Sequence, residues 1–298
     1  MPFLNRLKAA YRVMRVGLPQ PQAPMEDFRV SNLASSQHGD LLAGKNVLIS
    51  GAGPNIGKSL AVEMGRQGAH VFFTDLHEAW VLGLENQLQL QGISSKGLTC
   101  DIRKTEDVDA LCTFFDQNDI HIDVVVHNAA LEFKNTISLM DFNLEEWVQT
   151  YATNVFGPMY LTKCIVERMR RHGNPASIIF ITSIQQFNPS GRTSYSSSKA
   201  ALGMIVKELA VELAAFRIRV NGIAPGPVKV DGEGKPKPNR FMSLYKTSIP
   251  PEFIGRTAVF LASDYYSYCT TGTVLTVDGG TSLYNHHSAE LSQKRNKP

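Results

Sequence analysis

Tyr195 and Lys199 are the residues whose spacing in this sequence most directly suggests chemistry. They lie in "GRTSYSSSKAAL", a run with helical periodicity, and four residues apart they project from the same helix face. A phenol near pKa 10 is a poor proton shuttle at neutral pH, but an ammonium within a few Å favours the phenolate. The pair could then exchange a proton with an alcohol or carbonyl oxygen while hydride moves. The alternative is a surface pair, because Y-x-x-x-K also occurs by chance.

A glycine-rich turn follows the first apolar run, in "NVLISGAGPNIGKSL", residues 46–60. Gly51 and Gly53 are spaced as in the dinucleotide pattern G-x-G-x-x-G, but Ile56 holds the sixth position and the next glycine is Gly57. A helix that begins near Ile56 would direct free N–H groups and its positive dipole end at a pyrophosphate. Gly51 would permit the turn and Gly57 a close approach of the cofactor. Alone, this pattern would indicate no more than a structural turn.

Asp75 ends the second apolar run, in "FFTDL", where a carboxylate can accept hydrogen bonds from both hydroxyls of an adenosine ribose. The same charge repels a 2′-phosphate, and no Arg or Lys stands beside it or at Pro54 and Asn55. The sequence therefore favours NAD over NADP, with His77 as the reason to retain NADP. The alternative for Asp75 is a helix N-cap.

The elements that must position these residues alternate along the chain from residue 44 onward. Short β-rich runs predict strands at 46–50, 70–74, 97–100, 122–127, 177–182, 218–223 and 273–277. Helical periodicity predicts helices that include 57–67, 105–117, 143–171 and 193–215. This order predicts an α/β fold, a single Rossmann-like, doubly wound, seven-stranded parallel sheet with helices on both faces. Residues 229–250, rich in Lys, Arg and Pro, predict a mobile loop.

Length and composition divide the chain into one domain with two extensions. With 298 residues and 43% hydrophobic residues, it can bury one large core. We expect a catalytic domain at 44–282, an N-terminal helix and linker at 1–43, and a polar tail at 283–298. The body is close to neutral, which argues against a nucleic-acid partner. The cysteines lack metal-ligand spacing, so we expect no metal and idle thiols in a reducing, cytoplasmic compartment; they are Cys100, Cys112, Cys164 and Cys269.

The first eighteen residues predict a basic amphipathic helix, followed by the proline-rich stretch Pro19–Pro24. Such a helix can lie in a membrane interface or act as an organelle import signal. The alternative is a helix that packs on its own protein or on a partner subunit. No apolar run is long enough for a membrane-spanning helix.

Together these motifs resemble those of the short-chain dehydrogenase/reductase family, of the compact Y-x-x-x-K type, over about residues 44–282. The family's loop T-G-x-x-x-G-x-G is matched by Ser50, Gly51 and Gly57, which accounts for the late glycine. Asn55 stands where the middle glycine is usual. Because asparagine tolerates positive φ better than most residues, we expect the loop to close.

Further landmarks of the family arrive in order along the chain, and the resemblance implies their roles. "CDI" places Asp101 and Ile102 at the adenine site, and "HNAA" matches the family's N-N-A-G at Asn128 and Ala129. "TNVFGP" supplies Asn154 at a distorted helix turn, where it would hold a water linked to the lysine; Gly157 and Pro158 make the distortion credible. "FITSIQQ" supplies Ser183, which would bind the substrate oxygen. "APGPV" would place against the nicotinamide Pro225, Gly226 and Val228.

The resemblance implies an NAD(P)-dependent oxidoreductase that interconverts an alcohol and a carbonyl of a small molecule. Tyr195, Ser183 and Gln185 would contact the substrate, while Lys199 would bind the nicotinamide ribose. The expected pocket walls are Glu132, Gln185, Gln186, Phe187 and the 229–250 loop. Their polarity indicates a polar, anionic sugar-like or acyl substrate, the anionic option resting on Lys229, Lys235, Lys237 and Arg240.

The family also implies a homo-oligomer, a dimer or a tetramer. Two readings from other classes remain open at this stage. One is an NAD-binding sensor or scaffold without turnover, and the other is a membrane-associated adaptor that acts through its N-terminal helix.

Overall fold

The computed structural model describes residues 39–133, 140, 142–231, 237, 243–245 and 247–283. The helix predicted within residues 1–18, and all of the predicted tail beyond Leu283, lie outside the described residues. Lys235 and Arg240 of the basic loop lie outside them too. In the described part of that loop, the Lys237 backbone N–H donates to the Lys229 carbonyl at 2.8 Å.

Seven strands form one sheet in the order β3-β2-β1-β4-β5-β6-β7, and every neighbouring pair is parallel. The predicted fold class is therefore confirmed, and the predicted strands differ from the observed ones only at their ends. The strands are β1 (Asn46–Ser50), β2 (His70–Asp75), β3 (Ser95–Thr99), β4 (Val124–His127), β5 (Ala176–Ile181), β6 (Ile218–Pro225) and β7 (Val274–Val277).

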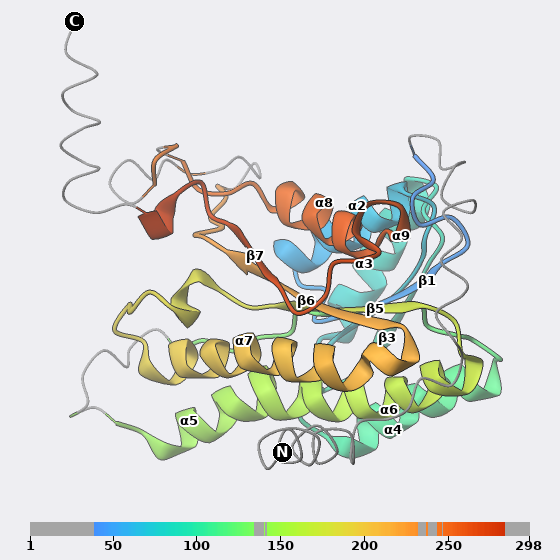
Figure 1. The fold of residues 1–298 in the computed structure, drawn as a ribbon, viewed down its shortest axis with the longest axis horizontal. Helices are drawn as coiled ribbons and strands as arrows, with labels where there is room; N and C mark the ends of the chain where they lie inside the picture. Colours follow the sequence, from blue (N-terminus) through green and yellow to red (C-terminus); the bar gives the residue numbers. More distant parts are fainter. Residues whose placement is uncertain are drawn as a thin grey trace, which may run out of the picture.

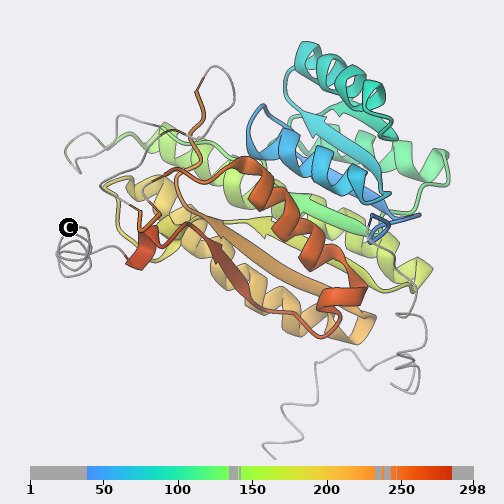
Figure 2. The same cartoon turned by 90° about the horizontal axis from the view of Figure 1, so that it is seen from above.

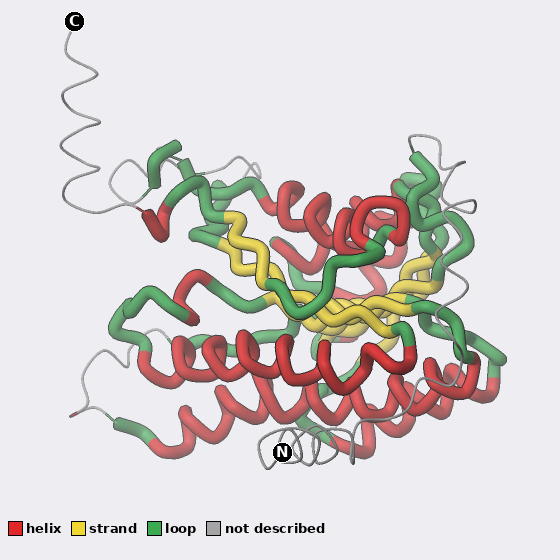
Figure 3. The backbone as a smooth tube through the Cα atoms, in the orientation of Figure 1, coloured by secondary structure: helices red, strands yellow, loops and turns green. Residues whose placement is uncertain are grey.

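Helices cover both faces of the sheet (Figure 1, Figure 3). One layer holds α2 (Ile56–Arg66), α3 (Glu78–Leu90), α8 (Pro251–Ala262) and α9 (Asp264–Ser267). The other layer holds α4 (Thr105–Gln117), α5 (Leu144–Tyr151), α6 (Gly157–His172) and α7 (Thr193–Leu213). Within the first layer α8 lies beside α2, as the view from above shows (Figure 2). None of the described helices is long and apolar enough to cross a membrane.

Three of these helices, α3, α8 and α9, lie outside the helices that the sequence predicts. The α8 helix begins at Pro251, directly after Pro250. This proline pair marks a break in the sequence, yet proline is favoured in the first turn of a helix because no N–H is needed there. The α3 helix buries only Val81, Leu84 and Leu88, and so its apolar stripe is narrow.

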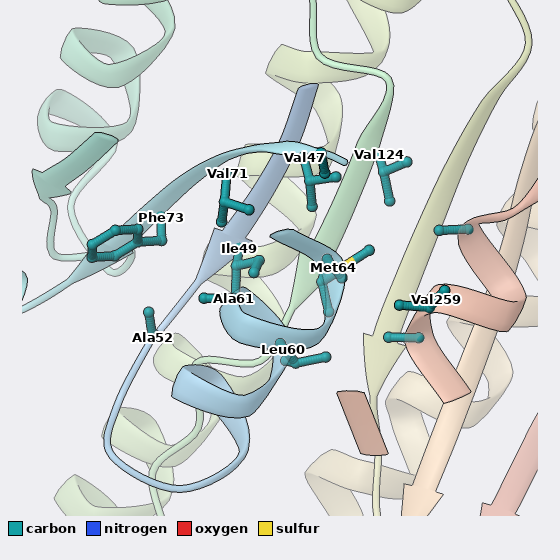
Figure 4. Packing of buried hydrophobic residues seen from close by; sticks show 14 of the residues in the cluster. Val47, Ile49, Ala52, Leu60, Ala61, Met64, Val71, Phe73, Val124 and Val259 are labelled. Atoms are coloured by element: carbon teal, nitrogen blue, oxygen red, sulfur yellow. The ribbon is translucent and has the colours of Figure 1, made fainter. Parts of the chain in front are cut away.

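The strands are buried on both faces. In β1, Val47 and Ile49 face α2, whereas Leu48 faces the opposite helix layer. Figure 4 shows Val47 and Ile49 packed with Leu60, Ala61 and Met64 of α2. A slip of one residue would exchange the two sets of side chains, so the packing fixes the register of the strands.

The strand order reverses between β1 and β4, which both pair with parallel neighbours on their other edges. In open parallel sheets, the crevice at the carboxyl ends beside such a reversal is where ligands bind. Ser50 and His127 are the last residues of these two strands, and they are register partners. The fold thus brings the glycine loop and the segment after β4 to one edge of the sheet.

Candidate active site

The glycine loop closes tightly between β1 and α2. Gly51 has φ +71°, and a Cβ added there would lie 2.5 Å from the Ala129 Cα. A Cβ at Gly57 would lie 2.5 Å from the Gly51 carbonyl oxygen. Both positions therefore require glycine, one for backbone conformation and one for close packing of the helix on the loop.

Asn55 does not adopt the conformation that the sequence led us to expect. It caps α2 with φ −100° and ψ −100°, so the loop closes without any positive φ at this position. The reasoning from asparagine's tolerance of left-handed backbone was therefore wrong. The turn is made instead at Gly51, and Asn55 needs no special backbone freedom.

The amino end of α2 fits an anionic group. Its first turn carries no acidic residue, and the Asn55 side chain makes no capping hydrogen bond. In the loop, the Ala52 N–H donates to the Thr74 carbonyl and the Lys58 N–H to the Gly53 carbonyl, both at 2.8 Å. Ile56 and Gly57 stand in the first turn of α2, where no earlier helix carbonyl can accept their N–H groups. Within the described structure, these two N–H groups are therefore available to a ligand. The residues present therefore fit the pyrophosphate of a dinucleotide.

Asp75 closes the other side of this cradle. One of its carboxylate oxygens accepts the His77 N–H at 3.1 Å, while the other would lie 3.9 Å from a Cβ at Gly53. The sequence reasoning missed Trp80, whose indole N–H donates to the Ala52 carbonyl at 2.6 Å and so ties α3 to the glycine loop. No local pattern could have found this contact, since the two residues are 28 apart in the chain.

Asp101 lies at the predicted adenine site, after β3, with both of its carboxylate oxygens held by Arg103. The guanidinium donates at 2.8 Å and 2.7 Å, and this hydrogen bonding keeps the pKa of Asp101 below its usual range. Ile102 follows, with its carbonyl oxygen packed 2.4 Å from where a Cβ at Gly157 would lie. Gly157 therefore allows the start of α6 to approach this loop.

The end of β4 is bonded to the glycine loop. The Asn128 side chain donates to the Gly51 carbonyl, and its backbone N–H donates to the Ser50 carbonyl at 3.2 Å. The Ser50 side chain is buried, and its hydroxyl has no partner within the described structure. Ala129 supplies the backbone against which Gly51 packs.

The end of β6 is in equally close contact with the segment after β7. The Gly226 N–H donates to the Val277 carbonyl at 2.9 Å, and a Cβ there would lie 2.7 Å from the Asp278 Cα. Pro225 is the last residue of β6. Val228 packs against the core cluster beneath α8, so its side chain is partly used for the fold.

Tyr195 and Lys199 lie together on α7, as predicted. The Lys199 ammonium is 5.5 Å from the Tyr195 ring centroid, and the lysine donates to the Ile181 carbonyl at 2.8 Å. Lys199 is only 2% exposed. Ser183, two residues after Ile181, is buried, and its Oγ accepts the Gln185 N–H at 3.1 Å. The structure thus brings three of the four expected catalytic side chains, Tyr195, Lys199 and Ser183, to the carboxyl end of β5; the fourth is Asn154.

The predicted long helix at 143–171 is interrupted at Asn154. A π-helical segment, Ala152–Phe156, separates α5 from α6 and stands directly before Gly157 and Pro158. The Asn154 side chain accepts the Leu131 N–H at 2.7 Å and donates to the Leu131 carbonyl at 3.1 Å. It also donates to the Ser198 Oγ at 2.9 Å. Asn154 therefore joins the segment after β4 to the residue beside Lys199.

The pKa values differ from the sequence-based expectation. Burial raises the pKa of Tyr195 to about 12, the Glu132 charge adds to the rise, and hydrogen bonding to Ser183 and the Arg192 charge oppose it. Burial lowers the pKa of Lys199 to about 8, against a rise from Glu132. The expectation of a phenol acidified by the lysine was therefore wrong for the protein alone. Loss of water is the main cause of the shift, and Lys199 is not among its causes because the ammonium donates to the Ile181 carbonyl.

The expected pocket walls differ in how free their side chains are. The Gln185 side-chain oxygen accepts from Ser190 at 2.8 Å and from Ser196 at 3.3 Å, so its amide N–H groups are what it can offer a substrate. Gln186 packs on α7 at Gly203, and Phe187 is exposed. Glu132 pairs with Arg192, a partner that the sequence reasoning did not identify. In the described part of the chain, no cluster of three or more His, Cys, Asp or Glu side chains could hold a metal ion.

Comparisons with known proteins find dehydrogenases and reductases that are similar to this chain. A family model described as enoyl-(acyl carrier protein) reductase matches residues 51–282. The human dehydrogenase/reductase SDR family member 4 is 34% identical, over 81% of this chain and 89% of its own length. The 7alpha-hydroxysteroid dehydrogenase of Escherichia coli strain K12 is 32% identical, over 80% of this chain and 94% of its own. The glucose 1-dehydrogenase of Gluconobacter oxydans is also 32% identical, over 82% and 94%.

Among solved structures, a short chain dehydrogenase from Mycobacterium smegmatis is similar, with a TM-score of 0.71 and 27% sequence identity. The match covers 82% of this chain and 95% of that chain. The two bacterial enzymes named above act on a steroid and on a sugar by their names, at equal identity to this chain. Similarity at this level therefore indicates the type of reaction but not the substrate, which depends on the residues that line the pocket.

Proposed function

Because the chain belongs to the short-chain dehydrogenase/reductase family of NAD(P)-dependent oxidoreductases, we propose that it interconverts a secondary alcohol and a ketone of a polar small molecule, with NAD as the preferred cofactor. The observation that carries this proposal is the convergence of Tyr195, Lys199 and Ser183 beside the glycine loop. The cofactor supplies the hydride acceptor or donor, and the protein supplies the proton and the orientation of the substrate.

Tyr195 is the proton-exchanging group. With its pKa raised to about 12 by burial, the phenol is protonated at neutral pH and is ready to donate to a carbonyl oxygen. Ser183 directs its hydroxyl at the same oxygen, where it stabilises developing negative charge. For oxidation the phenol must lose its proton, and this requires additional positive charge, which the oxidised nicotinamide ring carries.

Lys199 and Asn154 position the other groups. The lysine is anchored by the Ile181 carbonyl, from where its remaining N–H donors can hold the nicotinamide ribose and a water. The Asn154 amide donates to Leu131 and Ser198, and its oxygen accepts from Leu131. Its role in the proposal is therefore to fix the π-helical turn beside the lysine, next to which a water could relay the proton.

NAD is preferred in this proposal because Asp75 stands where the adenosine ribose would lie. Two unit charges 4 Å apart repel by about 1 kcal/mol in water and ~4 kcal/mol near a protein surface, so a 2′-phosphate beside Asp75 is disfavoured. The His77 backbone N–H is already bonded to the Asp75 carboxylate. The turn from Asp75 to His77 contains no Lys or Arg.

We further propose a homo-oligomer, a dimer or a tetramer, in the cytoplasm. Exposed apolar side chains on the α5–α7 layer support association; they are Val148, Phe156, Met204 and Val211. The N-terminal segment, outside the described residues, would add membrane contact or organelle targeting if its sequence pattern forms the amphipathic helix.

The experiment is a substrate panel with the purified protein. Secondary alcohols and ketones are tested with NAD and NADP, and turnover is followed by the absorbance of the reduced cofactor. Tyr195→Phe should lower kcat by about 10²- to 10⁴-fold with the cofactor Kd unchanged. Tyr160→Phe is the matched control, since the Tyr160 hydroxyl donates to Asp109 of α4 at 2.9 Å and also contacts Cys164 of α6.

Turnover by Tyr195→Phe within a few-fold of wild type would contradict the proposal. Cofactor binding without turnover of any substrate by the wild-type protein would favour the NAD-binding sensor or scaffold instead.

A further inference from the structure

Glu132 lies at the edge of the active site without a part in the proton path described above. It follows Leu131, whose backbone N–H and carbonyl are both bonded to the Asn154 side chain. Asn154 is fully buried and also contacts Ser198, the neighbour of Lys199. The backbone that carries Glu132 is therefore fixed relative to the catalytic helix.

Arg192 fixes the Glu132 side chain from the opposite side. The Arg192 guanidinium pairs with one carboxylate oxygen, Oε1. Arg192 caps α7 three residues before Tyr195, and residues three apart are neighbours on a helix. The ion pair therefore joins the segment after β4 to the helix turn that carries the catalytic phenol.

The second carboxylate oxygen of Glu132 remains open. Within the described structure no partner is recorded for Oε2, and 31% of the Glu132 side chain is exposed. One oxygen is thus anchored and the other can accept a hydrogen bond from a bound molecule. A carboxylate held this way is oriented before the substrate arrives.

The charge of Glu132 is directed at the reaction centre. After burial, which is the main cause for both groups, Glu132 raises the pKa of Tyr195 and that of Lys199. Arg192 lowers the pKa of Tyr195, as the smallest of its causes, and is not among the causes of the Lys199 shift. The groups that face Tyr195 are thus Glu132 from the segment after β4, Ser183 after β5, and Arg192 and Lys199 on α7.

We propose that Glu132 is a specificity-determining residue that accepts a hydrogen bond from a hydroxyl on the carbon next to the reacting carbinol. The site then prefers neutral vicinal diols, including polyols, over hydroxy acids whose carboxylate would occupy the same place. This inference rests on the proposed function and deepens it.

The chemistry of the two substituents explains the selection. An ionised carboxylate only accepts hydrogen bonds, and a substrate hydroxyl supplies the matching donor in a charge-assisted bond. A substrate carboxylate offers no donor and brings a second negative charge beside Glu132. Arg192 offsets this only in part, because one of its guanidinium nitrogens is already paired with the Glu132 carboxylate.

The test uses two matched sets of alcohols that differ only beside the carbinol. One set is cyclohexanol, 1,2-cyclohexanediol and 2-hydroxycyclohexanecarboxylate, and the other is 2-butanol, 2,3-butanediol and 3-hydroxy-2-methylbutanoate. The kcat/KM of each compound is measured with NAD for wild type, Glu132→Gln, Glu132→Asp and Arg192→Lys. Glu208→Gln is the matched control, the same substitution at an exposed position of α7.

Glu132→Gln should lower kcat/KM for the diols about tenfold and raise it for the hydroxy acids by about the same factor, with the simple alcohols unchanged. This follows because a neutral amide gives a weaker bond than a carboxylate and does not repel an anion. Glu132→Asp and Arg192→Lys keep both charges and should retain the preference for diols in part. Glu208→Gln should behave as wild type.

Equal changes for all three members of a set would overturn the proposal, because the ion pair would then only hold the fold. If wild type prefers the hydroxy acids, the proposal is overturned as well, while the dehydrogenase function stands. If wild type oxidises none of these alcohols although it binds NAD, the inference and the proposed function fail together.

Discussion

Replacement of Gly51 by alanine should destabilise the protein strongly, and the structure gives the magnitude. Gly51 has φ +71°, a left-handed conformation that costs a residue with a Cβ ~1–2 kcal/mol. The new Cβ would lie 2.5 Å from the Ala129 Cα and 2.7 Å from its N, and such overpacking costs ~1–3 kcal/mol. Together these costs lower the free energy of unfolding by about 2–5 kcal/mol.

Two other glycines provide controls for the same substitution. A Cβ at Gly53, in the same loop, would meet nothing nearer than the Asp75 carboxylate at 3.9 Å, so Gly53→Ala should leave stability unchanged. A Cβ at Gly83, inside α3, would meet nothing within 4 Å. Gly83→Ala should therefore stabilise the helix by ~0.5–1 kcal/mol, because alanine loses less backbone entropy than glycine.

Thermal unfolding followed by circular dichroism measures these effects. For a domain of this size, 1 kcal/mol corresponds to ~2–4 °C, and Gly51→Ala should lower Tm by about 4–20 °C. Its affinity for NAD should fall as well, because the Gly51 backbone sets the path of the loop toward α2. A Tm for Gly51→Ala within about 2 °C of wild type, or an equal loss for Gly53→Ala, would refute the packing argument.

Two further predictions concern acid stability and cofactor choice. His127 is buried, and burial lowers its pKa from 6.5 to about 3. As the pH falls, the unfolded chain therefore takes up the proton before the folded protein does. The contribution of His127 to the free energy of unfolding is full above pH 6.5 and is lost as the pH drops toward 3. His127→Asn should remove this loss, which is ~1.4 kcal/mol per pH unit. Urea unfolding of both proteins between about pH 7 and 4.5 measures it. Parallel curves of unfolding free energy against pH for the two proteins would show that the histidine is not responsible. Asp75→Ser should tighten NADP binding about tenfold, since the repulsion of the 2′-phosphate is removed, and should weaken NAD binding, since the carboxylate's hydrogen bonds to the ribose hydroxyls are lost. Titration calorimetry with both cofactors checks this, and an unchanged ratio of the two Kd values would place the adenosine ribose elsewhere.

Local signals in the sequence were enough for the sheet and for the positions of the main chemical groups. Apolar runs such as 46–50 and 218–223 predict buried strands, because a strand covered by helices on both faces needs apolar residues at successive positions. Both strands are buried in this way. The late glycine at Gly57 and the spacing of Tyr195 and Lys199 are patterns within a few neighbouring residues. In the structure Gly57 packs against Gly51, and Lys199 lies beside Tyr195. Breaks caused by proline were harder to interpret, and so the start of α8 at Pro251 was missed.

Contacts between distant segments were beyond the sequence. Glu132 and Arg192 are 60 residues apart, and Trp80 meets Ala52 across 28 residues, with no shared local pattern. The Asp101 carboxylate needs Arg103 only two residues away, yet their pairing depends on how the loop after β3 turns.

By itself, the sequence determined the strands, the glycine positions and the family of reaction, since each of these is set by residue types at short, fixed spacings. Only the tertiary structure decided the balance of forces within the site. The direction of the Tyr195 pKa depends on how much water is removed from the phenol and which charges face it, and both result from β4, β5 and α7 meeting in space. A pattern within one helix shows which groups are adjacent along the chain, but the surrounding elements set the dielectric in which those groups act.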